Sequence, residues 1–363
     1  MSGSGGKAAG GWQTMISLPA DPTRETLAKH LKAITYSKYG PPDVLRIEEV
    51  EKPVPKDDEV LIKVRAAEAT KSDCEMRSFK FAVKWFWLPL RIVLGIRKPK
   101  RQILGGYFSG QIEAVGKDVT GFSRGDPVFG AAGLKLGAYG EYVALPANGA
   151  IVSKPINMSF SDAAAVPLGG LNALHFMRLA SIQAGDKVLI NGAGGSIGTH
   201  AVQIAISMGG EVTAVDSSIK EDLLKRMGAN HFIDYTKESF AAMGRTFDVI
   251  FDVVAGNSFT ASIRALNANG RYLTANPRLS VMFRSIFISR FSGKTAKFAF
   301  AKESREELLA LKEMIENRKI KSIVDKVYPM EQAVHAHNRV ETEQRLGAVV
   351  IAIADDDDEL GTQ

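Results

Sequence analysis

The chain of 363 residues contains only one cysteine, Cys74. A single thiol excludes an internal disulfide and a cysteine-rich zinc cage. It also suits a reducing compartment, so we expect a cytoplasmic protein. No apolar run reaches the length of about 18 residues that a membrane-spanning helix requires. The glycine- and serine-rich start has no apolar signal-peptide core, so we expect residues 1–31 to form a flexible extension and residues 355–363 an acidic, disordered tail.

The chain has only a moderate excess of positive charge. There are 46 Lys and Arg residues against 40 Asp and Glu residues, a net charge of +6. The basic residues are interspersed with acidic ones over most of the chain and no RNA-binding motif is present, which argues against a nucleic-acid partner. The excess suits small anionic ligands. The length and a hydrophobic content of 45% predict about two domains.

The most informative stretch is residues 191–203, N-G-A-G-G-S-I-G-T-H-A-V-Q, which directly follows the apolar residues 187–190. Its glycines have the spacing G-x-x-G-x-x-G, which keeps a turn tight and lets the backbone approach a pyrophosphate. We expect that pyrophosphate at the N-terminus of the following helix, where N–H groups and the helix dipole favour an anion. The predicted cofactor-binding residues of the turn are Gly192, Gly195, Ser196, Ile197 and Gly198.

The residues after this turn alternate between apolar strands and amphipathic helices. Strands are predicted over residues 211–215, 231–235, 247–254 and 271–274, and a helix over residues 220–227. Such alternation indicates a parallel, doubly wound sheet that binds its ligand at the carboxyl ends of the strands. The stretch therefore predicts a dinucleotide-binding unit of a redox enzyme.

The residues before the turn have a different pattern. Apolar and polar residues alternate between turn residues, which predicts a mostly antiparallel β domain. The alternating segments are residues 32–36, 45–50, 59–65, 109–116 and 140–144. The end of the chain predicts a helix over residues 305–317 and then strand, helix and strand within residues 324–353. This part has no glycine fingerprint of its own, so we expect it to return to the β domain.

Seven stretches, in order, carry a resemblance to a known family over residues 32–353. They are K-A-I-T-Y-S-K-Y-G-P-P-D-V-L, F-S-G-Q-I-E-A-V-G, G-D-P-V-F-G, G-A-Y-G-E-Y-V-A, A-A-A-V-P-L-G-G-L-N-A-L-H, the glycine turn and M-G-A-N-H-F-I-D-Y. The chain resembles the medium-chain dehydrogenase/reductase superfamily, in its zinc-free quinone oxidoreductase-like branch. The resemblance implies an α/β protein: a GroES-like catalytic domain (residues 32–155 and 302–354) and a Rossmann NAD(P)-binding domain (residues 156–301), with the active site between them.

The resemblance also raises the question of zinc. Relatives with catalytic zinc use a cysteine, a histidine in a G-H-E stretch and a third ligand. Here that stretch is Gly105-Gly106-Tyr107, and none of the six histidines falls in it. We predict no metal site and interpret Cys74 as a small, partly buried apolar residue rather than a ligand or nucleophile. Without a Lewis acid, alcohol oxidation is disfavoured and hydride transfer to a quinone or an α,β-unsaturated carbonyl is expected. Alternatives are an enoyl-thioester reductase and a cofactor-binding scaffold without turnover.

Catalytic candidates follow from the resemblance. Thr70 stands where relatives carry a polar residue facing the nicotinamide, and Asp73 matches the same motif, although its carboxylate also suits a helix N-terminus. Tyr107 stands where relatives carry an acid. Its phenol can donate a proton or a hydrogen bond to a carbonyl, or it can simply fill space.

Three further residues are predicted on the cofactor. Tyr139 and Asn172 are expected to line the nicotinamide, and Asn276 is a further predicted cofactor-binding residue.

The adenosine end of the predicted site carries conflicting signs. Asp216 ends the second strand, where a carboxylate bonds the ribose hydroxyls of NADH and repels the 2′-phosphate of NADPH. Ser217, Lys220 and Tyr235 argue for NADPH, because the resemblance places a lysine and a tyrosine there to hold that phosphate. We favour NADPH over NADH, with Asp216 opposing Lys220.

Two stretches, residues 79–101 and 280–302, combine apolar bulk with positive charge. The expected partner is a small hydrophobic electrophilic substrate. These stretches predict the rim of a pocket for a bulky hydrophobic acceptor, neutral or anionic, or an edge in peripheral contact with a membrane surface. The alternative is a buried helix and a subunit contact, since apolar surface of this size often forms a homodimer interface.

Overall fold

The computed structural model describes residues 29–81, 87–254, 258–275, 279–299 and 301–354. Residues 1–28 of the predicted extension, the acidic tail and Asn276 lie outside these ranges. The first strand, β1 (His30–Thr35), begins inside the predicted extension, two residues before the expected domain start at residue 32. Within the described ranges, no helix has the length and apolar character needed to cross a membrane.

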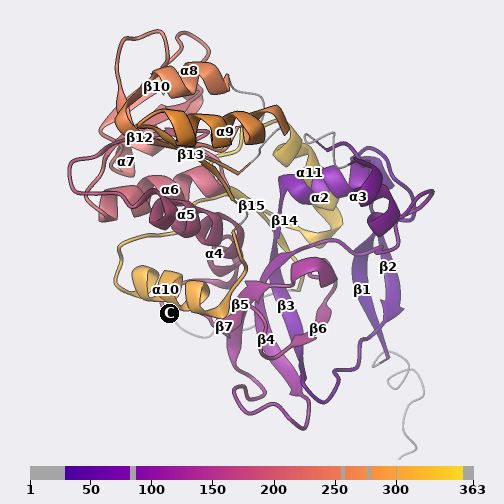
Figure 1. Cartoon of the computed structure of the whole chain (residues 1–363). Helices are drawn as coiled ribbons and strands as arrows, with labels where there is room; N and C mark the ends of the chain where they lie inside the picture. Colours follow the sequence, from indigo (N-terminus) through magenta and orange to yellow (C-terminus); the bar gives the residue numbers. More distant parts are fainter. Residues whose placement is uncertain (1–28, 82–86, 255–257, 276–278, 300, 355–363) are drawn as a thin grey trace, which may run out of the picture.

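The β domain is built on one large sheet (Figure 1). Its strands follow the order β14-β15-β3-β4-β5-β7, and β6 pairs with β3. All pairs are antiparallel except β14 with β15, so the predicted mostly antiparallel domain is confirmed. β1 and β2 (Arg46–Glu51) form a separate antiparallel pair. The sheet strands are β3 (Glu59–Ala69), β4 (Tyr107–Val115), β5 (Pro127–Ala131), β6 (Tyr142–Pro146), β7 (Ile151–Ser153), β14 (Val324–Pro329) and β15 (Ala348–Ala352).

The end of the chain returns to this sheet, as the sequence predicts. β15 pairs with β3, and Val350 lies opposite Glu68. The helices of the domain are α2 (Lys71–Ser78), α3 (Trp87–Leu94) and α11 (Ala333–Glu341), with short 3-10 turns at Pro42–Val44, Gly133–Lys135 and Met330–Gln332. Figure 1 shows all three helices at one end of the sheet, and α2 packs against α11.

The second domain holds a six-stranded sheet in the order β10-β9-β8-β11-β12-β13, in which every pair is parallel. This confirms the predicted doubly wound sheet. Its strands are β8 (Lys187–Asn191), β9 (Glu211–Asp216), β10 (His231–Asp234), β11 (Phe247–Asp252), β12 (Leu266–Thr274) and β13 (Thr295–Phe298). Its helices are α4 (Phe160–Ala164), α5 (Pro167–Ala180), α6 (Ser196–Ser207), α7 (Glu221–Arg226), α8 (Phe259–Arg264) and α9 (Leu279–Phe291). α10 (Arg305–Glu316), from the segment predicted to return to the β domain, packs against α5 and β7.

The predicted strands β9, β10 and β11 end one or two residues away from their observed ends, and two other elements differ more. The helix expected over residues 220–227 is divided into a 3-10 turn, η4 (Ser218–Lys220), and α7. β12 begins at Leu266 rather than at residue 271, because Leu266 already pairs with Phe247 before a register shift in the ladder. Neither change alters the sheet.

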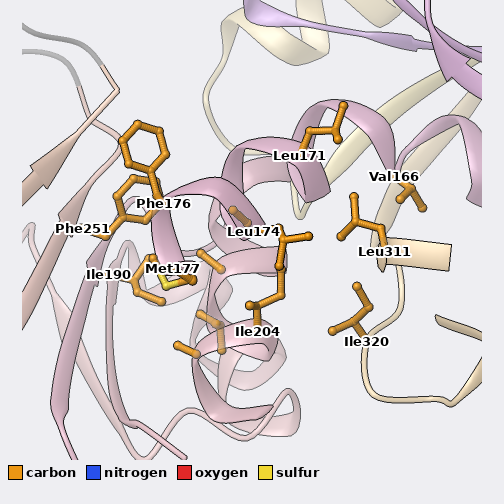
Figure 2. Packing of buried hydrophobic residues seen from close by; sticks show 14 of the residues in the cluster. Val166, Leu171, Leu174, Phe176, Met177, Ile190, Ile204, Phe251, Leu311 and Ile320 are labelled. Atoms are coloured by element: carbon orange, nitrogen blue, oxygen red, sulfur yellow. The ribbon is translucent and has the colours of Figure 1, made fainter. Parts of the chain in front are cut away.

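The core of the second domain also anchors the end of the chain. Figure 2 shows side chains of α5 packed against α6, β8, β11 and α10. The rings of Phe176 and Phe251 stack with centroids 4.8 Å apart. A side chain at Gly170 would meet Leu311 of α10 at 2.8 Å, so the glycine lets α10 pack closely. Each fully buried leucine stabilises such a core by about 1.5–3 kcal/mol. Phe129 and Ala131 of β5 and Val152 of β7 belong to the same buried cluster, so the two domains share part of this core.

Candidate functional site

The glycine turn joins β8 to α6 as predicted. Gly192 has a φ of 85°, and a Cβ at Gly198 would lie 2.2 Å from the Gly192 carbonyl oxygen. Only glycine at position 198 therefore allows so close an approach of turn and helix. The N-cap residue Gly195 supplies no side-chain cap, and the Ser196 hydroxyl makes no hydrogen bond of ordinary geometry among the described residues. The first turn of α6 thus offers unused donors, which fits a pyrophosphate.

The β domain lies directly against this turn. The amide of Gly347, just before β15, donates to the Gly194 carbonyl at 2.8 Å, and Gly195 forms a β-bridge with Gly347. Gly347 has a φ of 84°, and a Cβ there would lie 2.1 Å from the Ile323 carbonyl oxygen. A ligand on the turn would therefore lie at the junction of the two sheets.

A buried carboxyl from the β domain faces the same turn. Glu68 of β3 is 1% exposed, and its Oε2 atom has no hydrogen-bond partner among the described residues. Burial raises the pKa of Glu68 to about 8, and this rise prevails over the lowering effects of the Ser196 hydroxyl and the Arg345 guanidinium. Glu68 is thus largely protonated at neutral pH, although the sequence did not identify it.

Asp216 and Lys220, whose predicted cofactor preferences conflict, form an ion pair with each other. Lys220 Nζ lies 3.0 Å from Asp216 Oδ1. Asp216 Oδ1 also accepts from the Ser217 amide at 2.8 Å, and Oδ2 accepts from the Gly194 amide at 2.8 Å. Both carboxylate oxygens thus already accept hydrogen bonds from the protein. The 3-10 turn η4 brings the two residues together, because it places Lys220 one short turn after β9.

The remaining residues of the predicted adenosine end are more accessible. Tyr235 follows β10 and is 61% exposed, and Ser217 is half-buried beside the ion pair. Their predicted contact with the cofactor stays a prediction.

Thr70 and Asp73 form a capping box at the start of α2. Asp73 Oδ2 accepts from the Thr70 hydroxyl at 2.6 Å and from the Thr70 amide at 3.0 Å, while Oδ1 accepts from the Gly105 amide at 3.1 Å. Both side chains are buried. The structure thus gives Asp73 the helix-capping role that the sequence offered as its alternative, and the catalytic roles of both residues stay predictions.

Tyr139 is fully buried, at 0% exposure. Its hydroxyl lies 3.1 Å from His337 Nε2, and its ring fills the space that a side chain at Gly105 would occupy. Its position therefore gives no support to the predicted contact with the nicotinamide. Asn172 is half-buried on α5, where its amide donates to the Leu168 carbonyl at 2.9 Å.

Tyr107, at the start of β4, is half-buried and hydrogen-bonded to Glu303. Burial, reinforced by the negative charge of Glu303, raises the pKa of the phenol. Burial also raises the pKa of Glu303. The phenol therefore stays protonated at any ordinary pH and acts as a hydrogen-bond donor.

Comparison with known proteins agrees with this geometry. Residues 56–155 match the model of the alcohol dehydrogenase GroES-like domain, and residues 227–351 that of the zinc-binding dehydrogenase family. A 2-methylene-furan-3-one reductase of Solanum lycopersicum is 30% identical over 97% of this chain and 84% of its own. A quinone oxidoreductase of Sus scrofa is 31% identical over 86% of this chain and 94% of its own. The chain belongs to the medium-chain dehydrogenase/reductase superfamily.

The structural comparison points to the same branch of this superfamily. The quinone oxidoreductase from Coxiella burnetii superposes with a TM-score of 0.80 at 30% identity, over 90% of this chain and 100% of that chain. The predicted quinone oxidoreductase-like branch is confirmed, and the chain is an oxidoreductase of the superfamily.

The donor atoms around Cys74 do not suit the zinc that one matching family model names. The thiol is buried and lies 3.4 Å from His337 Nδ1, which also faces Arg77 Nη1 at 3.2 Å. Burial raises the pKa of the Cys74 thiol to about 12 and lowers the pKa of His337 to about 3. A guanidinium inside the cluster would repel a dication. Within the described ranges, no group of three or more His, Cys, Asp or Glu residues could hold a metal ion.

Five residues that the sequence did not predict take part in these side-chain clusters: Glu68, Arg77, Glu303, His337 and Arg345. Glu68 carried a signal, because an acidic residue within the apolar run Ala66-Ala67-Glu68-Ala69 is unexpected in a buried strand. The other four carried none, since their partners come from distant segments.

Proposed function

We propose that the protein is a zinc-independent, NAD(P)H-dependent reductase of quinones or α,β-unsaturated carbonyl compounds. The observation that carries this proposal is the uncapped start of α6, which the β domain meets at Gly347. It offers donors to a dinucleotide at the junction where a substrate could also reach it. The related quinone oxidoreductase and furanone reductase support the choice of acceptor.

The chain's own residues account for cofactor binding in this proposal. The turn residues predicted from the sequence, from Gly192 to Gly198, hold the pyrophosphate by backbone donors and the Ser196 hydroxyl. When bound, the nicotinamide supplies the hydride. We propose the predicted units for this arrangement, with a catalytic domain over residues 32–155 and 302–354 and a cofactor domain over residues 156–301.

Tyr107 polarises the acceptor in this proposal. In the free protein its single phenol proton is donated to Glu303. In this proposal the hydroxyl turns from Glu303 when the acceptor binds and donates the proton in a hydrogen bond to the carbonyl oxygen, where negative charge develops during reduction. Thr70 and Asp73 keep α2 and the Gly105 backbone in position beside it.

NADPH is the proposed cofactor. Lys220 neutralises Asp216, so the carboxylate that would repel a 2′-phosphate is already paired. The two further ammonium protons of Lys220 remain as donors for a phosphate. Tyr235 and Ser217 lie at the adjacent strand ends.

Independence from zinc rests on the donor set. The only thiol of the chain lies inside the Tyr139, His337 and Arg77 network rather than facing α6. Position 106, where the zinc-dependent relatives carry their histidine, is glycine.

The proposal includes a cytoplasmic homodimer. The single cysteine suits a reducing compartment. β13 is the outer strand of the parallel sheet, and Phe283 and Ile286 of the adjacent α9 are 72% and 64% exposed. An outer strand beside exposed apolar side chains is suited to pairing with a second copy.

A peripheral contact with anionic membranes through α3 is the last part of the proposal. The helix has no buried residue, and Trp87, Leu88, Ile92, Val93 and Ile96 are 48–66% exposed. Arg91 stacks on the rings of Tyr39 and Phe79, which holds the helix against the domain and leaves its apolar side outward. Residues 76–112 contain eight Lys and Arg but no Asp or Glu. Apolar side chains next to unopposed positive charge complement an anionic lipid surface.

A cofactor-oxidation assay tests the proposed function. NADPH and NADH would be followed with ortho- and para-quinones, enals and an enoyl thioester. Turnover of quinones or enals, faster with NADPH, is expected. Turnover of the enoyl thioester alone would favour the enoyl-thioester reductase, and tight cofactor binding without turnover would favour the scaffold.

A further inference from the structure

Glu68 is an unusual residue for its position in β3. It lies in a run of alanines, opposite Val350 of β15, and is almost completely buried. Its Oε2 atom has no hydrogen-bond partner within the described ranges. A buried carboxyl that lacks a partner destabilises the fold, and more so when it is charged. Packing alone therefore gives no reason for an acid here.

The surroundings of Glu68 point toward the dinucleotide site. Ser196, the first residue of α6, lies beside the carboxyl and acts on it through its hydroxyl. Neither Glu68 Oε2 nor the Ser196 hydroxyl makes a hydrogen bond of ordinary geometry among the described residues. Two polar groups from different domains, each without a well-formed hydrogen bond, therefore meet where the free N–H groups of α6 begin.

Four further groups act on Glu68 or on its proton. Arg345, which precedes β15, is the cation that acts on it, and its guanidinium also donates to the Val340 carbonyl at 2.8 Å. Asp73 of α2 adds negative charge, and the neutral phenols of Tyr107 and Tyr139 lie within its electrostatic reach. Arg345 is thus the one positively charged group in this set. When Glu68 is ionised and an anion is bound, this single charge faces two negative groups.

We propose that Glu68 belongs to the pyrophosphate subsite as a neutral carboxylic acid, whose proton is donated toward the bound cofactor, and that its ionisation expels the cofactor. This inference rests on the proposed function, because it assumes a dinucleotide on α6. Cofactor binding should therefore weaken at alkaline pH. The glycine turn alone would not cause this loss, because its backbone N–H donors do not titrate.

The direction of the effect follows from linkage. The burial that raises the pKa of Glu68 to about 8 keeps the acid protonated in the free protein below that pH. A bound anion raises this pKa further, so binding takes up a proton once the free carboxyl is ionised. The cofactor Kd should be constant below about pH 8 and should rise by up to tenfold per pH unit above it.

The test is calorimetric titration of the full-length protein with NADH and with ADP-ribose between pH 6.5 and 9.5. Neither ligand has a phosphate group that titrates near this range, whereas the 2′-phosphate of NADPH titrates at about pH 6, close to its lower end. The Glu68→Gln variant, whose amide mimics the neutral acid, should have a Kd that does not change with pH. Glu59→Gln is the matched control, because Glu59 is a buried acid of the same strand that pairs with Lys135 instead. It should keep the wild-type profile.

A second measurement needs only the wild-type protein. Titrations at pH 9 in buffers of different ionisation enthalpy report proton uptake, and close to one proton per bound ligand is expected. A wild-type Kd that is constant up to pH 9.5, no proton uptake, or the same alkaline loss in Glu68→Gln would each overturn the inference. Absence of binding at every pH would instead contradict the proposed function.

Discussion

Lys220 Nζ lies 3.0 Å from Asp216 Oδ1, and both side chains are buried beside the glycine turn. The same carboxylate accepts a hydrogen bond from the Gly194 amide. A Cβ at Gly194 would lie 2.3 Å from the Lys220 side chain, so the turn, the carboxylate and the lysine pack as one unit. The charge at the end of β9 is therefore balanced before any cofactor binds, which removes the repulsion expected for NADPH.

Replacing Lys220 by methionine should weaken NADPH binding much more than NADH binding. Methionine keeps the apolar stem but removes the charge, and a charge-assisted hydrogen bond contributes about 1.5–3 kcal/mol, so the NADPH Kd should rise at least about tenfold. Fluorescence titration with both cofactors measures it. The control is Lys225→Met, which changes an exposed lysine on α7 that pairs with Glu221. An equal loss for both cofactors would mean that Lys220 only supports the turn.

Removing the phenol of Tyr107 should slow reduction without changing cofactor affinity. In Tyr107→Phe the acceptor oxygen loses its donor, and kcat with an enal should fall by about a hundredfold. Tyr142→Phe serves as control, because Tyr142 lies on β6 and packs against Lys52 instead. Steady-state kinetics and a separate NADPH titration distinguish the two effects. An unchanged kcat in Tyr107→Phe would assign this tyrosine to packing.

Stability should depend on pH through Glu68. Its folded-state pKa of about 8 exceeds the ordinary value of 4.5, so the folded protein holds a proton that the unfolded chain releases between these values. The free energy of unfolding contributed by this group therefore falls as pH rises through that window and is constant above it. Relative to wild type, the melting temperature of Glu68→Gln should rise by at least about 2 °C between pH 5 and pH 8. Parallel melting curves for the two proteins would contradict the raised pKa.

Metal removal should leave activity intact. Dialysis against 1,10-phenanthroline is expected to change kcat/KM by less than about twofold, and added zinc should not restore or increase it, because the thiol of Cys74 is enclosed with Arg77. Cys74→Ala should remain active with a modest loss of stability of about 1 kcal/mol. Loss of turnover on chelation, reversed by zinc, would contradict the metal-independent proposal.

The α3 surface should bind vesicles that contain anionic lipid. Flotation with phosphatidylserine vesicles is expected at low salt and should disappear at high salt or with phosphatidylcholine alone. Trp87→Ser with Val93→Ser should abolish it, whereas Leu134→Ser, at an even more exposed position elsewhere, should not. If the protein does not bind phosphatidylserine vesicles at either low or high salt, the proposed membrane contact is wrong. A switch from dimer to monomer in the double variant would show that the face joins two copies.

The sequence could predict the features that depend on local spacing. The G-x-x-G-x-x-G turn, the parallel sheet around it and the antiparallel domain before it all follow from periodicity within short windows. The last strands also could be assigned to the β domain from a local feature. Residues 324–353 contain no glycine motif for a cofactor, which predicts that they join the β domain rather than form a second cofactor-binding unit.

The side-chain partnerships could not be predicted in the same way. The sequence predicts a separate cofactor contact for Asp216 and for Lys220. The structure shows that the two side chains form an ion pair, because the 3-10 turn between them brings them together. Glu68 meets Ser196, and Tyr107 meets Glu303, because separate domains and the returning chain pack together. The position of Tyr139 could not be predicted for the same reason. Its hydroxyl lies beside His337 of the distant helix α11, and this buried position gives no support to the predicted contact with the nicotinamide.

The protein is expected to transfer a hydride directly from a reduced nicotinamide to a conjugated acceptor. NADPH deuterated at C4 of the nicotinamide, incubated with the metal-free protein and an α,β-unsaturated ketone, tests it most directly by mass spectrometry and NMR of the product. We expect one deuterium at the β-carbon of the saturated ketone. It should be transferred from only one of the two C4-deuterated epimers of the cofactor. Product without deuterium, or no product while NADPH binds tightly, would contradict it.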